Sequence, residues 1–149
     1  MKKLLMPALL ALATTLSATY SVADDDDDTL GAAGLMSGSN KEDLPEVVLS
    51  VGEPLGGPWT LKSGKYYEVE FTADGSGEIG LDIADFSRAV WIDEIVIEGL
   101  EIRPYGVQSV EFDDAGTMEF GFVAIKPGQY EIRIVGSTGE SQALQVTVE

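Results

Sequence analysis

The side chains of this chain that could do chemistry are carboxylates. The sequence holds 26 Asp and Glu residues against 9 Lys and Arg residues, and it has no histidine and no cysteine. Ser-His and Cys-His catalysis cannot be built without these two residue types. Carboxylate oxygens bind hard cations such as Ca²⁺ or a lanthanide, and a pair of carboxylates can hydrolyse a glycosidic bond. Cation binding and carboxylate-pair hydrolysis are therefore the two chemistries that the composition leaves open.

Six acids of the folded part are candidate oxygen ligands for Ca²⁺ or a lanthanide, because they stand in pairs at short spacing: Asp82, Asp85, Asp93, Glu94, Asp113 and Asp114. The first pair flanks an expected helical turn, the second follows that turn, and the third lies in an Asp/Gly hairpin turn. Exposed strand faces and turns are also filled with Asp and Glu in proteins without a metal, so solvation is the simpler explanation of each pair. No acid stands in a catalytic motif. We therefore expect a non-catalytic protein, with a carboxylate-pair hydrolase as the remote alternative.

The N-terminus has the pattern of a secretory signal. Lys2 and Lys3 precede an apolar run over residues 4–18, which is too short to span a bilayer comfortably, and small residues lead to a cleavage site expected after Ala23. We expect a signal peptide over residues 1–23 and a periplasmic or secreted protein. Cleavage changes the formal charge from -17 to -19, because the two lysines leave and no acid precedes Asp24.

So negative a charge limits the partners of the protein. It excludes ordinary nucleic-acid binding, which needs clustered Lys and Arg, and after signal cleavage it disfavours membrane surfaces. It favours hard cations or a basic partner protein.

Residues 24–43 read as an acidic tail. The five aspartates of residues 24–28 repel one another, and the Gly-, Ser- and Ala-rich stretch after them has no period of a strand or a helix. The run also lacks the D-x-D-x-D-G spacing that wraps a loop around one ion. We expect this tail to be disordered and dispensable for folding, and residues 44–149 to form one domain.

Apolar and polar residues alternate from Leu44 onward. Tyr67, Val69 and Phe71 alternate with two glutamates, which indicates a strand with one wet face. Strands are expected over residues 46–51, 66–72, 78–83, 92–102, 107–112, 120–124, 130–134 and 144–148, with turn residues between them. The pattern predicts an all-β, antiparallel Greek-key sandwich with at most one short helix, at residues 84–91. Trp59 and Trp91 are expected to pack in the core or against loops.

The segment FVAIKPGQYEIRIV at residues 122–135, followed by ALQVTV at residues 143–148, resembles the C-terminal half of a cupredoxin. The D-x-x-G-T of residues 113–117 is a further similarity. The resemblance implies a cupredoxin-like fold. In that family a copper-binding Cys falls four residues after the Tyr of the motif, where this chain has Ile134, and a loop with a His and a Met follows. Residues 136–142 offer no nitrogen or sulfur ligand, so the frame is expected without copper, which a blue-copper protein binds through two His and one Cys.

The sequence thus predicts an exported, non-catalytic, cupredoxin-like binding module that lacks the copper ligands. We expect it to hold a hard cation of the Ca²⁺ or lanthanide type, or a basic exported partner protein, as an accessory or chaperone to another exported enzyme. The alternative is a structural or interaction sandwich with no specific ligand.

Overall fold

A computed structural model of the protein describes residues 34–149. The expected signal peptide over residues 1–23 and the aspartate run over residues 24–28 lie outside the described residues. Within the described part, no helix is both long and apolar enough to cross a membrane.

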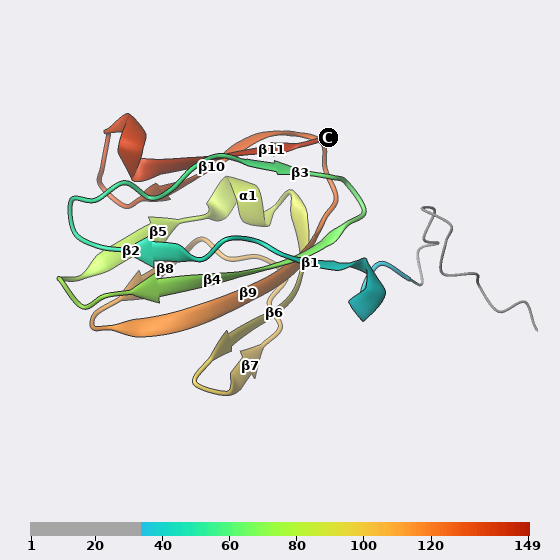
Figure 1. Ribbon diagram of the computed structural model, residues 1–149, viewed down its shortest axis with the longest axis horizontal. Coiled ribbons are helices and arrows are strands. Elements are labelled where there is room, and N and C mark those ends of the chain that lie inside the picture. Colours follow the sequence, from blue (N-terminus) through green and yellow to red (C-terminus); the bar gives the residue numbers. More distant parts are fainter. Residues whose placement is uncertain (1–33) are drawn as a thin grey trace, which may run out of the picture.

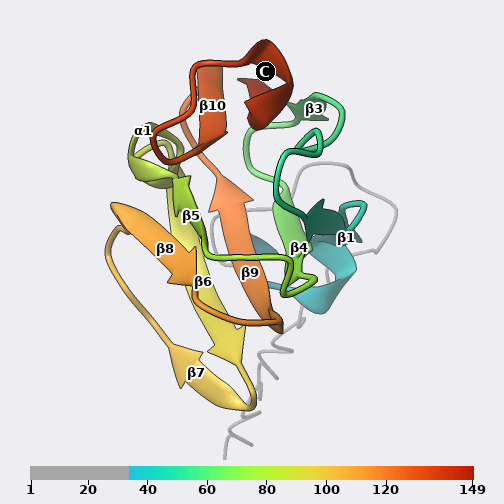
Figure 2. The same ribbon diagram turned by 90° about the vertical axis from the view of Figure 1, so that its left-hand side faces the viewer.

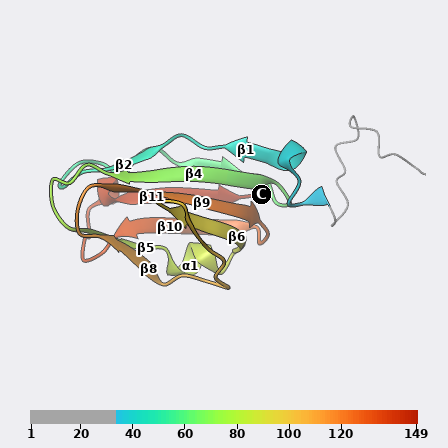
Figure 3. The ribbon, with the colours of Figure 1, turned by 90° about the horizontal axis from the view of Figure 1, so that it is seen from below.

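Two β-sheets face each other across one core (Figures 1 and 3). Sheet A consists, in spatial order, of β1 (Lys41–Asp43), β4 (Tyr66–Ala73), β9 (Gly116–Ala124), β6 (Val90–Ile97) and β7 (Leu100–Ile102), with β2 (Val47–Leu49) also beside β4. Sheet B consists of β3 (Trp59–Leu61), β11 (Ala143–Val148), β10 (Gly128–Ile134), β5 (Ile79–Asp82) and β8 (Ser109–Phe112). The short helix α1 (Ala84–Ser87) follows β5, and the described part also contains the 3₁₀ turns η2 (Gly38–Asn40) and η3 (Glu140–Gln142). The predicted all-β sandwich with one short helix is confirmed.

Aromatic rings fill the space between the sheets. Phe86 of α1 meets Phe122 of β9 edge to face, with ring centroids 5.2 Å apart, and Phe122 meets Phe120 at 5.3 Å. Trp59 of β3 closes the same cluster against Phe86. Each such fully buried side chain stabilises the fold by about 1.5–3 kcal/mol relative to exposure to water. The strand alternation seen in the sequence is thus the alternation between this core and solvent.

The segment 130–134 has the predicted register. Ile132 is fully buried, and Tyr130 and Ile134 on the same face pack partly buried against the core. Arg133 and Glu131 lie on the opposite face and form an ion pair, with Nε and Oε1 2.8 Å apart. The Tyr130 hydroxyl donates to the Lys126 carbonyl at 2.9 Å, which ties the start of β10 to the turn before it.

Three features differ from the expectations. The short edge strands β1, β2 and β3 pair in parallel with their neighbours, and no strand was predicted at Trp59–Leu61. The predicted strand over residues 92–102 is two strands, β6 and β7, joined by a tight turn. Glu98 and Gly99 in this turn both have positive φ, 49° and 80°, as the central residues of a type I′ hairpin turn do.

The ordered domain also begins before Leu44. Residues 38–43 were expected to belong to a disordered tail, but they form η2 and β1, and Lys41–Asp43 pairs with residues 66–68 of β4. The Asn40 side chain is buried, and its amide donates to the Leu35 and Gly64 carbonyls, at 2.9 Å each. This amide fastens the segment to the β3–β4 turn, which composition alone did not reveal.

Candidate functional site

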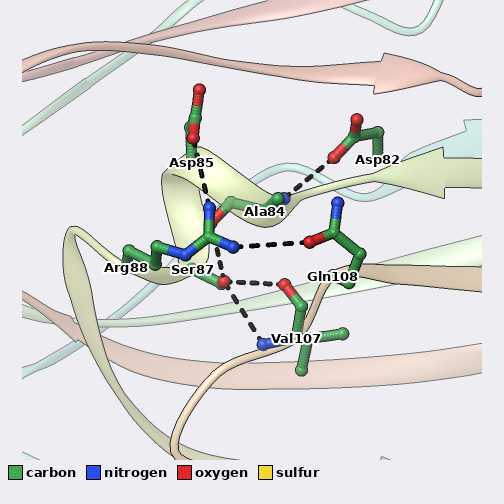
Figure 4. A network of polar contacts seen from close by, with 7 residues as sticks. All are labelled: Asp82, Ala84, Asp85, Ser87, Arg88, Val107 and Gln108. Carbon is green, nitrogen blue, oxygen red and sulfur yellow. Dashed lines mark hydrogen bonds and ion pairs between the residues drawn. The ribbon is translucent and has the colours of Figure 1, made fainter.

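The six predicted ligands do not form one site. The first pair, Asp82 and Asp85, serves the local fold of α1 (Figure 4). The Asp82 carboxylate accepts a hydrogen bond from the Ala84 backbone N–H at 3.0 Å, and Asp85 pairs with Arg88 at 3.3 Å. Arg88 also donates to the Gln108 side chain at 3.4 Å. Both carboxylates therefore have partners within the turn.

The third pair lies in the turn between β8 and β9. Asp113, but not Asp114, joins two acids that the sequence analysis missed, Glu78 and Glu111. One carboxylate oxygen of each lies within 4.8 Å of the others, and all three side chains are exposed. The group forms because β5 pairs with β8, with Ile79 opposite Phe112, which brings the ends of two distant segments together.

The second pair, Asp93 and Glu94, lies on the outer face of sheet A. A β-bulge in β6 between Ile92 and Glu94 adds one residue there, which turns Asp93 toward β4. The Asp93 carboxylate accepts a hydrogen bond from the Tyr66 hydroxyl at 3.1 Å, and Glu94 pairs with Arg103 at 2.8 Å.

Further acids share this surface, because the registers of three adjacent strands align them. Glu70 of β4 lies directly opposite Glu119 of β9, and Glu68 lies opposite Gly121, one pair further along. Glu94 of β6 lies on the other side of Gly121. We call the resulting surface the acidic face; it consists of Glu68, Glu70, Asp93, Glu94 and Glu119.

The acidic face is crowded and partly desolvated. The side chains of Glu68, Asp93 and Glu94 are only 19%, 22% and 21% exposed. Burial and the neighbouring charge of Glu68 raise the pKa of Glu119 above its ordinary value. Like charges directly opposite each other on neighbouring strands destabilise a sheet. These acids therefore oppose the fold that presents them.

Among residues 34–149, two cations reach this surface. Lys41 of β1 forms an ion pair with Glu68, and Arg103, after β7, pairs with Glu94 and Glu101. They offset only part of the charge of the acidic face, which stays negative.

Two aromatic side chains, Tyr66 and Trp91, border the acids. They are aligned with Val123 across β4, β9 and β6 on the outer side of the sheet, where Tyr66 and Val123 are buried. Trp59 is buried as expected, whereas Trp91 is 59% exposed, because β6 turns it away from the core toward solvent. The expectation that Trp91 packs in the core or against loops is wrong.

The Tyr66 ring lies over a glycine. A Cβ atom at Gly121 would come within 2.8 Å of the Tyr66 hydroxyl oxygen. The ring can lie flat across β9 and reach Asp93 because this position has no side chain. Burial and the hydrogen bond to Asp93 raise the pKa of Tyr66, so the phenol stays a donor to that carboxylate.

Two solved structures share this architecture. A multi-copper oxidase from Pseudomonas thermotolerans superposes with a TM-score of 0.52 and 15% identity, over 74% of this chain and 30% of that one. A blue copper oxidase from Nitrosomonas europaea superposes with a TM-score of 0.50 and 12% identity, over 64% of this chain and 31% of that one. The fold is cupredoxin-like. No protein-family model and no curated protein matches the sequence.

The described residues span about a third of the length of these two cupredoxin-like neighbours. In the cupredoxin frame, the position that the sequence motif assigns to the copper thiolate is Ile134, at the end of β10, where its aliphatic side chain packs against the core. The acidic face lies elsewhere, on β4, β9 and β6 of the other sheet. It is thus a separate feature of this cupredoxin-like domain.

The acidic face is a surface and not a cleft. A hollow of about 560 Å³ lies between α1 and β10, away from these acids, and is lined by Asp85, Arg88, Ala89, Lys126, Gln129, Tyr130, Glu131 and Gln145. A second hollow of about 330 Å³ lies beside β2 and β3. An open face of carboxylates with aromatic neighbours suits a cationic macromolecule better than an enclosed small molecule.

Proposed function

We propose that this chain is an exported, non-catalytic, cupredoxin-like module that binds a basic partner protein through the acidic face. The observation that carries the proposal is the like-charge alignment across β4 and β9, with Glu70 opposite Glu119 and Glu68 beside them. Opposite charges or threonines at these positions would stabilise the sheet more. A cationic partner that neutralises the acids converts this destabilising arrangement into binding free energy.

The aromatic border supports a protein partner. Trp91 is exposed beside the carboxylates, and indole rings attract Lys and Arg through cation–π contacts. Trp and Tyr are also the residue types that most often dominate the energy of protein interfaces. The partner that fits this surface is an exported basic protein or enzyme, which the module accompanies as an accessory or chaperone.

Copper has no part in the proposal. The two neighbouring structures are copper oxidases. This chain has no histidine and no cysteine, and the position of the thiolate in the motif is Ile134. Two imidazoles and a thiolate therefore cannot be assembled, and we propose a copper-free, non-enzymatic role for this domain.

The test of the proposal measures where a cation binds, not only whether it does. The purified chain without residues 1–23 is titrated calorimetrically with a flexible lysine-rich peptide at physiological salt. We expect the double variant Glu68→Gln/Glu119→Gln to weaken binding by about tenfold, which corresponds to roughly 1.4 kcal/mol.

The matched control removes the same charge elsewhere. Glu78→Gln/Glu111→Gln leaves the acidic face intact, and we expect it to change the affinity by less than about twofold. If both double variants weaken binding equally, the peptide senses net charge alone and the proposal is wrong.

A hard cation is the second candidate ligand, at Glu78, Glu111 and Asp113, because their carboxylate oxygens lie within 4.8 Å of one another. Such a site would saturate with micromolar Ca²⁺ or lanthanide at physiological salt and raise the melting temperature beyond matched ionic strength. The same two double variants then exchange roles, since Glu78→Gln/Glu111→Gln would abolish the effect and Glu68→Gln/Glu119→Gln would not. A melting temperature that follows ionic strength alone would rule this candidate out.

A further inference from the structure

The β6–β7 hairpin extends beyond the rest of the sandwich (Figures 1 and 2). Ile95 pairs with Ile102, and Ile97 pairs with Leu100, so these four side chains share one face of the hairpin. It is the face that sheet A turns toward the core, because Ile95 is buried and lies opposite Phe120 of β9.

The outer part of this face is uncovered. Ile97, Leu100 and Ile102 are 41%, 62% and 41% exposed, whereas the core-facing positions of β9 beside them are fully buried. Sheet B ends at β8, and β7 is the last strand of sheet A on that side. We call Ile97, Leu100 and Ile102 the apolar strip. Large aliphatic side chains gathered on a projecting element are typical of an interaction site.

The hairpin that carries the strip is acidic at its tip and on its other face, because Glu101 lies between Leu100 and Ile102 and side chains alternate along a strand. The segment 94–103 contains Glu94, Glu98 and Glu101 but one base, Arg103, and that base already pairs with Glu94 and Glu101. Glu98 lies at the tip of the hairpin with φ 49°, a conformation that glycine or asparagine adopts more readily. The tip thus presents a carboxylate at a position where the turn itself does not favour one.

The same charges argue against a second copy of this chain as the occupant. Two hairpins in contact would bring Glu98 of both copies together, in molecules that each carry a formal charge of -19 once residues 1–23 are removed. A basic segment is attracted to Glu98.

We propose that the apolar strip seats an amphipathic segment of the basic partner, with aliphatic side chains on Ile97, Leu100 and Ile102 and with a Lys or Arg side chain against Glu98 at the tip of the hairpin. The charge of this partner rests on the proposed function. The hairpin joins the two surfaces, because Glu94 of β6 belongs to the acidic face on one side of the hairpin and Ile97 of the same strand belongs to the strip on the other side. The acidic face attracts the partner by charge, and the apolar strip selects partners that also carry an apolar ridge.

Two probes separate these contributions. One is an amphipathic peptide of leucine and lysine, and the other is the flexible lysine-rich peptide with the same number of lysines and no apolar residue. We expect Leu100→Thr/Ile102→Thr to weaken binding of the amphipathic probe by about tenfold and to leave the flexible probe unchanged.

The control variant is Val48→Thr/Val135→Thr, which removes two other exposed aliphatic side chains and should change neither affinity. If the double change in the hairpin lowers the melting temperature, Leu100→Thr alone, at the most exposed position of the strip, replaces it.

The outcomes tell the two proposals apart. Equal loss for both probes, or no loss for the amphipathic one, overturns the role of the strip, whatever the acidic face does. If Glu68→Gln/Glu119→Gln binds both probes as the wild type does, while Leu100→Thr/Ile102→Thr loses affinity for the amphipathic probe, the proposed role of the acidic face is wrong and that of the strip stands. If sedimentation shows a concentration-dependent dimer that Leu100→Thr/Ile102→Thr dissociates, the occupant of the strip is a second copy of the chain, and the inference is also wrong.

Discussion

The contact between Tyr66 and Gly121 offers the sharpest test of how the acidic face is built. The perturbation is Gly121→Ala, a single methyl group in the middle of β9. Its carbon would lie 2.8 Å from the Tyr66 hydroxyl oxygen and 3.5 Å from two ring carbons. The second distance is ordinary contact, whereas the first is not, so the hydroxyl has to move away from Asp93.

The magnitude follows from what is lost and gained. The hydroxyl gives up a 3.1 Å hydrogen bond to a partly buried carboxylate, and bonds to charged groups contribute about 1.5–3 kcal/mol. Replacing glycine by alanine inside a strand returns about 0.5–1 kcal/mol. We therefore expect Gly121→Ala to lower the free energy of unfolding by about 1–2 kcal/mol. In a Tyr66→Phe background the hydrogen bond is already absent, and the same change should be stabilising by about 0.5–1 kcal/mol.

The assay is urea unfolding followed by circular dichroism for the four members of this double-mutant cycle. Gly116→Ala, in the same strand, is the matched control, because its added carbon would meet nothing within 4 Å. A coupling energy between Tyr66→Phe and Gly121→Ala near zero, with Gly121→Ala no worse than Gly116→Ala, would refute the reasoning.

Three further outcomes follow from the structure. Because the pKa of Glu119 is raised, the folded protein binds this proton at a higher pH than the unfolded chain does, so the wild type loses stability as the pH rises above the ordinary pKa of 4.5. Glu119→Gln should therefore be more stable than the wild type near pH 7 and lose that advantage toward pH 4. A difference in urea unfolding that does not change with pH would contradict this. Asn40→Ala removes two buried 2.9 Å hydrogen bonds and should lower the free energy of unfolding by about 1–3 kcal/mol. In thermal melts, a chain that starts at Leu44 should be at least as unstable as this variant, whereas the control Ser39→Ala should melt like the wild type. Glu98→Asn relieves a φ of 49° and should stabilise by roughly 0.5–1 kcal/mol, whereas destabilisation in thermal melts would show that the carboxylate has a local partner.

The strands that alternate cleanly were predictable, because burial on one face leaves a mark in the sequence. Tyr67, Val69 and Phe71 predicted β4, and Ile132 with its neighbours predicted the register of β10. The strand Lys41–Asp43 left no such mark, since all of its side chains are exposed and it is held by backbone pairing with β4 and by surface ion pairs such as Lys41–Glu68.

The acidic face was only half visible for a related reason. Glu68 and Glu70 were recognised as the wet face of a strand, and Asp93 and Glu94 as candidate ligands. That they share one surface with Glu119 depends on which strands are neighbours and in what register. Strand pairing between residues about fifty positions apart is a property of the whole fold and not of a local pattern.

The lengths of the strands have a consequence for how this protein can fail. The long strands β4, β6 and β9, of 8, 8 and 9 residues, all lie inside sheet A, and each outermost strand of either sheet has only 3 or 4 residues. A short outermost strand is a poor template for a foreign strand. It is also held by few hydrogen bonds and detaches more easily than the interior. Without any disulfide to restrain it, the chain can begin to aggregate when β7 peels away and leaves β6 as the new rim, long before the core unfolds.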